Sequence, residues 1–115
     1  MSFESLTSRT REFATERDWE QSHTPKNLAM ALAGEAGELL AEFQWLTAEE
    51  SANLSTEQQT AVSEELADVL IYLCRLADVA GIDLEQAALD KIEANSVRYS
   101  IEVAKGNAAK VERSE

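Results

Sequence analysis

The sequence predicts an all-α protein, an antiparallel four-helix bundle formed by a single domain. Helix-breaking residues are few, because the 115 residues include one Pro and four Gly, and runs of β-branched residues are short. Helix-start signals recur along the chain, and the segments between the predicted helices are short, as they are in antiparallel bundles. A chain of this length is long enough for one hydrophobic core.

The first two predicted helices are separated by an irregular loop. The first helix is expected over residues 2–17, and the loop DWEQSHTPK follows it. Thr24 followed by Pro25 is typical of a helix N-cap with proline at the first helical position. We therefore expect the second helix to begin at Pro25 and to end near residue 46.

Two capping boxes predict the next elements. Thr47 and Glu50 have the spacing at which two side chains satisfy the first backbone N–H groups of a helix, so a short helical turn is expected there. Ser55 and Gln58 have the same spacing and predict the start of the third helix. This helix is expected to end near Gly81, since glycine commonly follows the last helical residue.

Asp83 predicts the N-cap of a fourth helix, which we expect over residues 84–103. Residues 1–104 are expected to form the helical domain. The remaining residues, 105–115, are mostly small and polar, and they predict a flexible tail.

The third predicted helix is apolar nearly all round. Within LADVLIYLCRLADVA, Leu66, Val69 and Leu73 form one stripe, whereas Ile71 and Val79 face the opposite side. A helix that is apolar on all sides is usually buried on all sides, and a small bundle covers only one of them. We therefore expect a homo-oligomer that buries the second side.

Charge and composition exclude several classes of protein. The chain carries 22 acidic and 10 basic residues, a formal net charge of −12, whereas proteins that bind nucleic-acid polymers need clustered Lys and Arg. No apolar run approaches the ~20 residues of a membrane span, and the first residues lack the apolar core of a signal peptide. Cys74 is the only cysteine and is expected in the core, so the chain has no internal disulfide. We expect a cytoplasmic protein without nucleic-acid or membrane partners.

Four carboxylates lie against the faces that the second and third helices must pack. At about 100° per residue, Glu35 falls inside the apolar stripe of the second helix, and Glu38 falls at its edge. Glu65 and Asp68 form a polar seam beside the stripe of the third helix. Each pair has i, i+3 spacing, which places both acids on one surface of their helix. If the two helices are neighbours, the four carboxylates converge in one groove.

Converging carboxylates repel one another and need a counter-charge. No basic residue lies between Lys26 and Arg75, and carboxylate oxygens suit Mg²⁺ or Mn²⁺, so a divalent cation is the better neutraliser. A di-iron centre would need Glu-x-x-His pairs, and the single histidine, His23, lies in a loop. Mg²⁺ in such sites usually binds substrate phosphates as well. The competing interpretation is that these acids are solvated.

Aromatic and polar side chains near the acids are candidates to hold a substrate. Four of them have aromatic rings, for which core packing is the alternative: Trp19, His23, Trp45 and Tyr72. On the fourth helix, Lys91, Asn95 and Arg98 continue the apolar stripe. From their position the two basic residues are expected to pair with the acids, whereas the family resemblance given next implies that they bind phosphate oxygens and makes Asn95 a candidate for the edge of a base.

Two of these motifs, in this order, resemble a known family. GEAGELLAEFQW followed by EELADVLIYL is similar to the MazG-like superfamily of all-α nucleoside triphosphate pyrophosphatases, whose signature is ExxE and then ExxD. The stretches RDWEQSHTPKNLAMAL, DLEQAALDKIEANSVRY and AKGNAAK are similar to its dCTP pyrophosphatase branch. The resemblance covers roughly residues 10–110.

The resemblance implies an enzyme that hydrolyses a nucleoside triphosphate, with dCTP or a modified dCTP as the expected substrate, to the monophosphate and pyrophosphate. It implies that Glu35, Glu38, Glu65 and Asp68 hold Mg²⁺ against the triphosphate while an activated water attacks the α-phosphorus. Mn²⁺ is an expected substitute. The implied nucleotide contacts are Trp19, His23, Trp45, Tyr72, Lys91, Asn95, Arg98 and Tyr99. Lys105 and Lys110 are candidates to close over the site. Family members assemble as dimers or dimer-of-dimers tetramers.

Two alternatives stay open at this stage. One is a related pyrophosphohydrolase that acts on dUTP, dUDP or phosphoribosyl-ATP, and the other is a non-catalytic acidic oligomerisation module. The segment TAEESANLSTEQQ is shorter and poorer in Gly and Pro than in the dCTP branch, which leaves the base preference open. Gly34 and Gly37 flank the acids, and we expect them to allow close helix approach or to leave room for a metal-bound water molecule.

Overall fold

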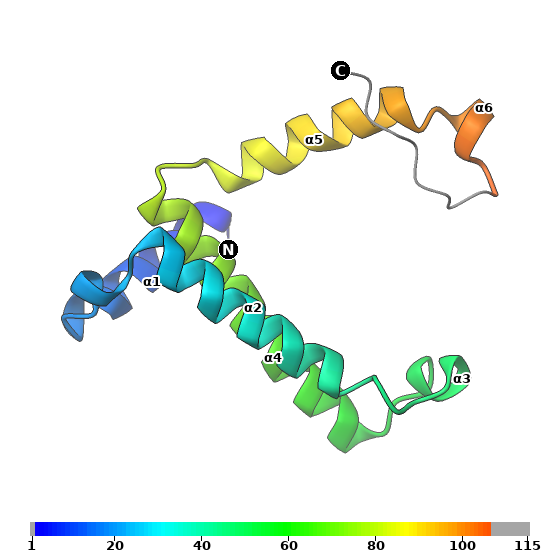
Figure 1. Cartoon of the computed structure of the whole chain (residues 1–115), viewed down its shortest axis with the longest axis horizontal. Helices are drawn as coiled ribbons and strands as arrows, with labels where there is room; N and C mark the ends of the chain where they lie inside the picture. The colour runs from blue at the N-terminus through cyan, green and yellow to red at the C-terminus, as the bar shows by residue number, and fades with distance from the viewer. Residues whose placement is uncertain (1, 107–115) are drawn as a thin grey trace. The chain divides into compact units, whose positions relative to one another are not determined.

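The computed structural model describes residues 2–106, which divide into two compact units, Met1–Ile82 and Asp83–Glu115. Every regular element in the described part is helical, so the all-α prediction is confirmed (Figure 1). None of the helices in this part is long and apolar enough to cross a membrane. Most of the predicted tail, residues 107–115, lies outside the described residues.

The helices of the two units follow one another with short connections. The first unit contains α1 (Phe3–Glu16), the 3₁₀ helix η1 (Glu20–Ser22), α2 (Pro25–Ala41), α3 (Ala48–Ser51) and α4 (Thr56–Val79). The second unit contains α5 (Leu84–Arg98) and α6 (Ile101–Ala104). The loop predicted before α2 is partly helical, because η1 lies within it.

The predicted helix starts are formed by the side chains that the sequence indicated. Thr24 Oγ1 accepts a hydrogen bond from the N–H of Asn27 at 3.1 Å at the start of α2. Thr47 and Ser55 begin α3 and α4 with complete capping boxes. These bonds satisfy backbone N–H groups that have no partner within their own helix.

The second helix is shorter than predicted. α2 ends at Ala41, and residues 42–46 form successive turns in which most backbone N–H groups bond to carbonyls three residues back. This spacing winds the chain more tightly than an α-helix does, so the side chains beyond Ala41 leave the helical phase. Trp45, which the sequence placed within the second helix, therefore lies beyond its end.

The fourth predicted helix is divided in two. It begins as expected, because Asp83 accepts a hydrogen bond from a backbone N–H of the first turn of α5. It ends at Arg98, where Tyr99 leaves the helical region with φ −112° and ψ 63°. The chain resumes as α6 at Ile101, so the prediction of one continuous helix over residues 84–103 is wrong.

Gly81 ends α4 in the way that the sequence predicts. It lies two residues beyond the last helical residue, and its φ of 70° is in the left-handed region. Glycine adopts this conformation without the steric cost that a side chain would bring.

The core of the first unit forms where α4 packs against α2 and α1 (Figure 1). The hydrophobic side chains that it buries are mostly small: Ala14, Leu28, Val62, Cys74 and Ala77. The burial of Cys74 confirms the prediction of a core thiol. Leu66, which we expected in the packed stripe, is 53% exposed in the single chain. The four-helix bundle, the single-domain boundary and the oligomer stay predictions.

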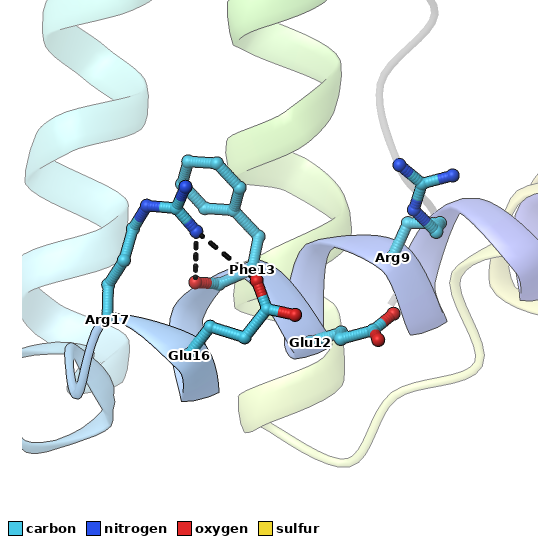
Figure 2. Close-up of a pocket in the computed structure, with 5 residues that line it drawn as sticks. All are labelled: Arg9, Glu12, Phe13, Glu16 and Arg17. Atoms are coloured by element: carbon cyan, nitrogen blue, oxygen red, sulfur yellow. Dashed lines mark hydrogen bonds and ion pairs between the residues drawn. The ribbon is translucent and has the colours of Figure 1, made fainter.

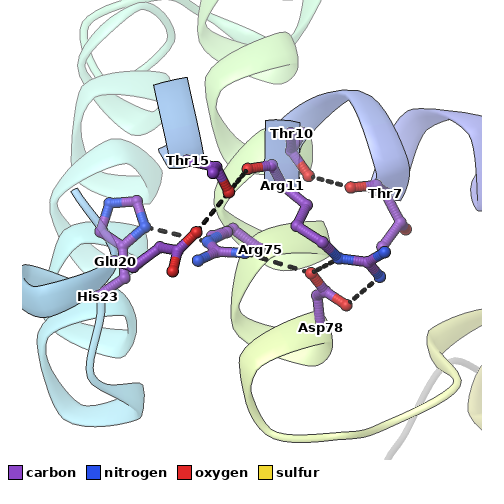
Figure 3. Close-up of polar contacts among 8 residues, drawn as sticks. All are labelled: Thr7, Thr10, Arg11, Thr15, Glu20, His23, Arg75 and Asp78. Carbon is purple, nitrogen blue, oxygen red and sulfur yellow. Dashed lines mark hydrogen bonds and ion pairs between the residues drawn. The ribbon is translucent and has the colours of Figure 1, made fainter. Parts of the chain in front are cut away.

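A charged network also joins α1 to α4 (Figure 3). Arg11 on α1 donates to both carboxylate oxygens of Asp78 on α4, at 2.8 and 2.6 Å. Arg75, one turn earlier on α4 and only 7% exposed, donates to the same carboxylate at 3.2 Å. The hydrogen bond from Arg11, together with the charges of both guanidinium groups, holds the pKa of Asp78 below its ordinary value.

Replacing Asp78 by Asn should destabilise the first unit at pH 7 by about 2 kcal/mol, because Arg75 would stay buried without its carboxylate partner. The pKa of Asp78 is lower in the folded protein than in the unfolded chain, so its charged carboxylate stabilises the fold at pH values above the ordinary carboxyl pKa. This stabilisation is lost as the pH falls through the pKa that Asp78 has in the folded protein. In urea unfolding, the difference between wild type and Asp78→Asn should therefore shrink at progressively lower pH. Asp18→Asn, at an exposed position, is the control and should show no such loss. Equal stability of wild type and Asp78→Asn at pH 7 would contradict this role of the network.

Candidate active site

The predicted carboxylates meet where α2 packs along α4. Carboxylate oxygens of Glu35 and Glu38 from α2 and of Glu65 from α4 lie within 4.8 Å of one another. Glu35 is half-buried and Glu38 is exposed, as expected for one acid inside the apolar stripe and one at its edge. Asp68, one turn after Glu65, is near enough for its charge to act on Glu35 and Glu65. These four residues are called the acidic cluster below.

The charges of the acidic cluster oppose one another. Partial burial and the neighbouring carboxyl groups, above all that of Glu38, raise the pKa of Glu35 and the pKa of Glu65. The Oε2 atom of each of these two side chains is buried and has no hydrogen-bond partner among the described residues. A buried carboxylate oxygen without a donor is unfavourable. These two atoms are therefore placed for a ligand that supplies positive charge.

A divalent cation fits this set of donors. All of them are carboxylate oxygens, which suit hard cations such as Mg²⁺ and Mn²⁺, whereas copper and zinc favour nitrogen or sulfur ligands. In the described part of the chain, no Lys or Arg forms an ion pair with any member of the acidic cluster. The cluster could thus hold a metal ion without first breaking a salt bridge.

A pocket of about 400 Å³ shares Asp68 with the acidic cluster. Three predicted nucleotide contacts line it: Trp19, His23 and Tyr72. The Trp19 ring meets the rings of Phe13 and His23 edge-on, with centroids 5.7 and 6.2 Å apart. The structure therefore brings four aromatic rings, that of Phe13 included, and one acid of the cluster to one cavity, which suits a ligand with a planar ring.

Three further pocket residues with charged or aromatic side chains were not predicted as site residues. They are Arg9 and Phe13 from α1, and Arg75 from α4. Arg75 had a signal in the sequence, because it is the one basic residue of the apolar run LADVLIYLCRLADVA, and a buried guanidinium needs partners. Phe13 also had a signal, because it shares one face of the first predicted helix with Leu6 and Thr10, whereas Arg9 had none.

Trp45 does not line this pocket. Its side chain lies in the turns after α2 and is 87% exposed in the single chain. Its contact with a nucleotide stays a prediction. Glu42, for which the sequence indicated no role, is half-buried at the end of α2.

The remaining predicted nucleotide contacts belong to the second unit. Arg98 Nη2 donates to Asn95 Oδ1 at 3.5 Å, and the Arg98 guanidinium lies 4.9 Å from the centroid of the Tyr99 ring. Lys91 is exposed, two turns before Arg98 on α5. The contacts of these residues with a nucleotide stay predictions, as does the closing role of Lys105. Lys110 lies outside the described residues.

Gly34 and Gly37 do not mark a close contact between helices. A Cβ atom placed at either position would have no neighbour within 4 Å. The expectation that these glycines allow close helix approach is therefore wrong. The other expectation, that they leave room for a ligand beside the acids, stays a prediction.

A second hollow, of about 350 Å³, lies along α1 and the residue that follows it (Figure 2). Three of its lining residues, Phe13, Glu16 and Arg17, contact one another. The Arg17 guanidinium lies 3.6 Å from the centroid of the Phe13 ring and donates to the Phe13 carbonyl oxygen at 3.2 Å. Arg17 also pairs with Glu16 at 3.6 Å. We assign no ligand to this hollow, because it lies on the surface of a single helix and none of its described lining residues has a buried polar group without a partner.

The fold and the site together define an all-α protein with an acidic cluster that is suited to a divalent cation. The chain belongs to the MazG-like family, whose family model matches residues 31–112. The family predicted from the ExxE and ExxD motifs is therefore confirmed.

Known relatives narrow this assignment. The chain is 48% identical over 101 residues to dCTP pyrophosphatase 1 of Bos taurus and to that of Homo sapiens, in alignments that cover 86% of this chain. These alignments cover 60% and 59% of the two relatives, so the chain spans well under two thirds of their length. The crystal structure of a pyrophosphatase from Archaeoglobus fulgidus is similar with a TM-score of 0.79 and 43% identity, over 84% of this chain and 91% of that chain.

Replacing Glu65 by Gln should raise the melting temperature of the metal-free protein, because it removes one of the mutually repelling charges of the acidic cluster. The same change should abolish most of the rise in melting temperature that Mg²⁺ causes in the wild type, since a ligand that binds only the folded state stabilises it. Thermal unfolding with and without Mg²⁺ measures both effects. Glu64→Gln is the matched control, because Glu64 is adjacent and exposed, and it should leave the Mg²⁺ effect intact. An undiminished Mg²⁺ effect in Glu65→Gln would contradict the cation site.

Proposed function

We propose that this protein is a Mg²⁺-dependent nucleoside triphosphate pyrophosphatase that converts dCTP or a modified dCTP to the monophosphate and pyrophosphate. The proposal rests on the acidic cluster, which shares Asp68 with a pocket lined by Trp19, His23 and Tyr72. The names of the relatives support the same chemistry, because two are dCTP pyrophosphatases and one is a pyrophosphatase. We place the reaction in the cytoplasm, where it would remove surplus or modified nucleotides.

The acidic cluster provides the metal-binding part of this proposal. Glu35, Glu38, Glu65 and Asp68 would hold Mg²⁺, and Mn²⁺ would substitute because it also prefers oxygen ligands. When bound, the ion would neutralise triphosphate charge and acidify a water molecule. The chain itself fixes the four carboxylates on two packed helices. Such preorganisation avoids rearranging the charged groups when the substrate arrives.

The pocket provides the base-binding part. Trp19 and Tyr72 offer ring faces, and stacking on an aromatic side chain contributes about 1–3 kcal/mol per base in proteins that bind single-stranded nucleic acid. The other proposed nucleotide contacts keep the roles that the family resemblance implies. Lys91 and Arg98 would contact phosphate oxygens, and Tyr99 would brace them. Asn95 would meet the base edge, and Trp45 would lie against the base.

Incubation of the protein with Mg²⁺ and dCTP should release dCMP and pyrophosphate, not dCDP and orthophosphate. In H₂¹⁸O the label should enter dCMP, because the proposed reaction breaks the bond at the α-phosphorus. Glu38→Gln should lower kcat/KM by about 100-fold or more, since it removes a charge that holds the catalytic arrangement together. Anion-exchange chromatography with mass spectrometry measures the products, the label and the rates.

Two controls accompany this assay. Glu64→Gln should leave kcat/KM within a small factor of wild type, because Glu64 is exposed and lies outside the acidic cluster. Parallel incubation with dUTP, dUDP and the other nucleoside triphosphates reports the base preference. Orthophosphate release, or no turnover of any nucleotide, would refute the proposed function.

We also propose that the protein works as a homo-oligomer, either a dimer or a dimer-of-dimers tetramer. Apolar side chains of α4 support this proposal, because Leu66 is 53% exposed and Ile71 is 42% exposed in the single chain. Large apolar side chains that stay exposed on more than one side of a helix are consistent with burial against a second copy of the chain.

Replacing Leu66 by Gln should weaken self-association about tenfold or more, because burying a leucine side chain stabilises an interface by about 1.5–3 kcal/mol. Sedimentation velocity over a range of protein concentrations measures this shift toward smaller species. A wild type that sediments as a monomer at all concentrations would contradict the oligomer.

A further inference from the structure

Arg75 connects the α1–α4 network to the pocket (Figure 3). Its Nε–H donates to Nδ1 of His23 at 3.0 Å, and its Nη1 donates to Asp78 at 3.2 Å. Arg11 holds the same carboxylate with two further hydrogen bonds. The buried guanidinium of Arg75 is therefore held at both ends, by an imidazole on one side and by a paired carboxylate on the other.

The hydrogen bond from Arg75 determines which nitrogen of His23 carries the proton. A guanidinium has only donors and keeps its proton in proteins, so Nδ1 must accept with its lone pair. The imidazole is then neutral, and its single proton is on Nε2. Partial burial and the charge of Arg75 also lower the pKa of His23, which favours the neutral ring near pH 7.

The Nε2–H group is available to a ligand. His23 lines the pocket together with Trp19 and Tyr72. The bond from Arg75 uses only Nδ1 of the ring. Among residues 2–106, no hydrogen-bond partner of Nε2–H is present. The other charged side chains on the pocket wall are Arg9 of α1 and Asp68 of α4. The pocket wall thus includes a neutral imidazole whose Nε2–H is not used by another described residue.

We propose that Arg75 is a positioning residue for base recognition, which holds His23 as the Nε2–H tautomer so that this group donates to a ring carbonyl oxygen of the base, such as O2 of cytosine. This inference rests on the proposed nucleotide function and deepens it. The exocyclic amino group of cytosine is a donor and does not match Nε2–H. A base that turned only donors toward His23 would leave both groups unpaired, which a buried site penalises.

The single histidine of the chain makes the tautomer measurable without any turnover. In tag-free protein with ¹⁵N-labelled histidine, long-range ¹H–¹⁵N NMR spectra at pH 7 should show a protonated Nε2 and an unprotonated Nδ1. Addition of dCMP should shift the Nε2–H proton and slow its exchange, whereas deoxyribose 5-phosphate, which lacks the base, should not. An Nδ1–H tautomer, a protonated ring, or an equal response to both ligands would overturn the proposal.

Variants of Arg75 test the positioning role. In Arg75→Gln, His23 should populate both of its tautomers. KM for dCTP should then rise about three- to tenfold with kcat nearly unchanged, because the hydrogen bond from His23 to the bound base is weakened or lost. Arg75→Lys keeps the charge and one donor, and it should restore part of the loss. Lys26→Gln is the matched control, because it removes an exposed positive charge close to His23 in the sequence and should change neither KM nor the tautomer.

The two measurements distinguish this inference from the proposed function. An intact Nε2–H response to dCMP without hydrolysis of any nucleotide would refute the hydrolase and support the base contact. Normal hydrolysis with an unchanged tautomer and KM in Arg75→Gln would overturn the positioning role and support the hydrolase. Circular dichroism checks the folding of the variants, and the wild-type spectra test the tautomer even if Arg75→Gln does not fold.

Discussion

The packing of α2 along α4 is the contact on which the candidate site depends. It brings Glu35 and Glu38 within 4.8 Å of Glu65 and leaves buried carboxylate oxygens without donors. Because these groups repel one another, other interactions must hold the helices together, among them the burial of Leu28 and Val62. The core therefore maintains an unfavourable arrangement of charge, which a bound cation would relieve. Occupancy of the site and stability of the fold are linked for this reason.

The two halves of α4 accommodate buried charge in opposite ways. At Glu65 the neighbouring groups are other acids, and the pKa is raised. At Asp78 two guanidinium groups surround one carboxylate, and the pKa is lowered. A raised carboxyl pKa in a cluster without cations is typical of a functional site, whereas a paired carboxylate of this kind stabilises the fold. One helix thus carries both a structural ion network and the acids proposed for catalysis.

α4 also sets the spacing between the parts of the site. Asp68 belongs to the acidic cluster and to the pocket, Tyr72 lines the pocket one turn later, and Arg75 reaches His23 about one turn beyond that. One turn of an α-helix advances by about 5.4 Å, so Glu65 and Asp68, proposed for metal binding, and Tyr72, proposed for base binding, are held on one rigid element. Groups on helices are positioned more accurately than groups on loops.

The sequence by itself determined where the helices begin and that the four acids lie on the packed faces of their helices. Capping boxes such as that of Ser55 and the i, i+3 spacing of carboxylates act within one helical turn, so they can be read from neighbouring residues. Only the tertiary structure decided that α2 ends at Ala41, which separates Trp45 from the helix, and that Arg75 meets His23. That hydrogen bond joins residues 52 positions apart, and it exists because of the way in which α4 packs against α1 and the start of α2, which no local pattern encodes.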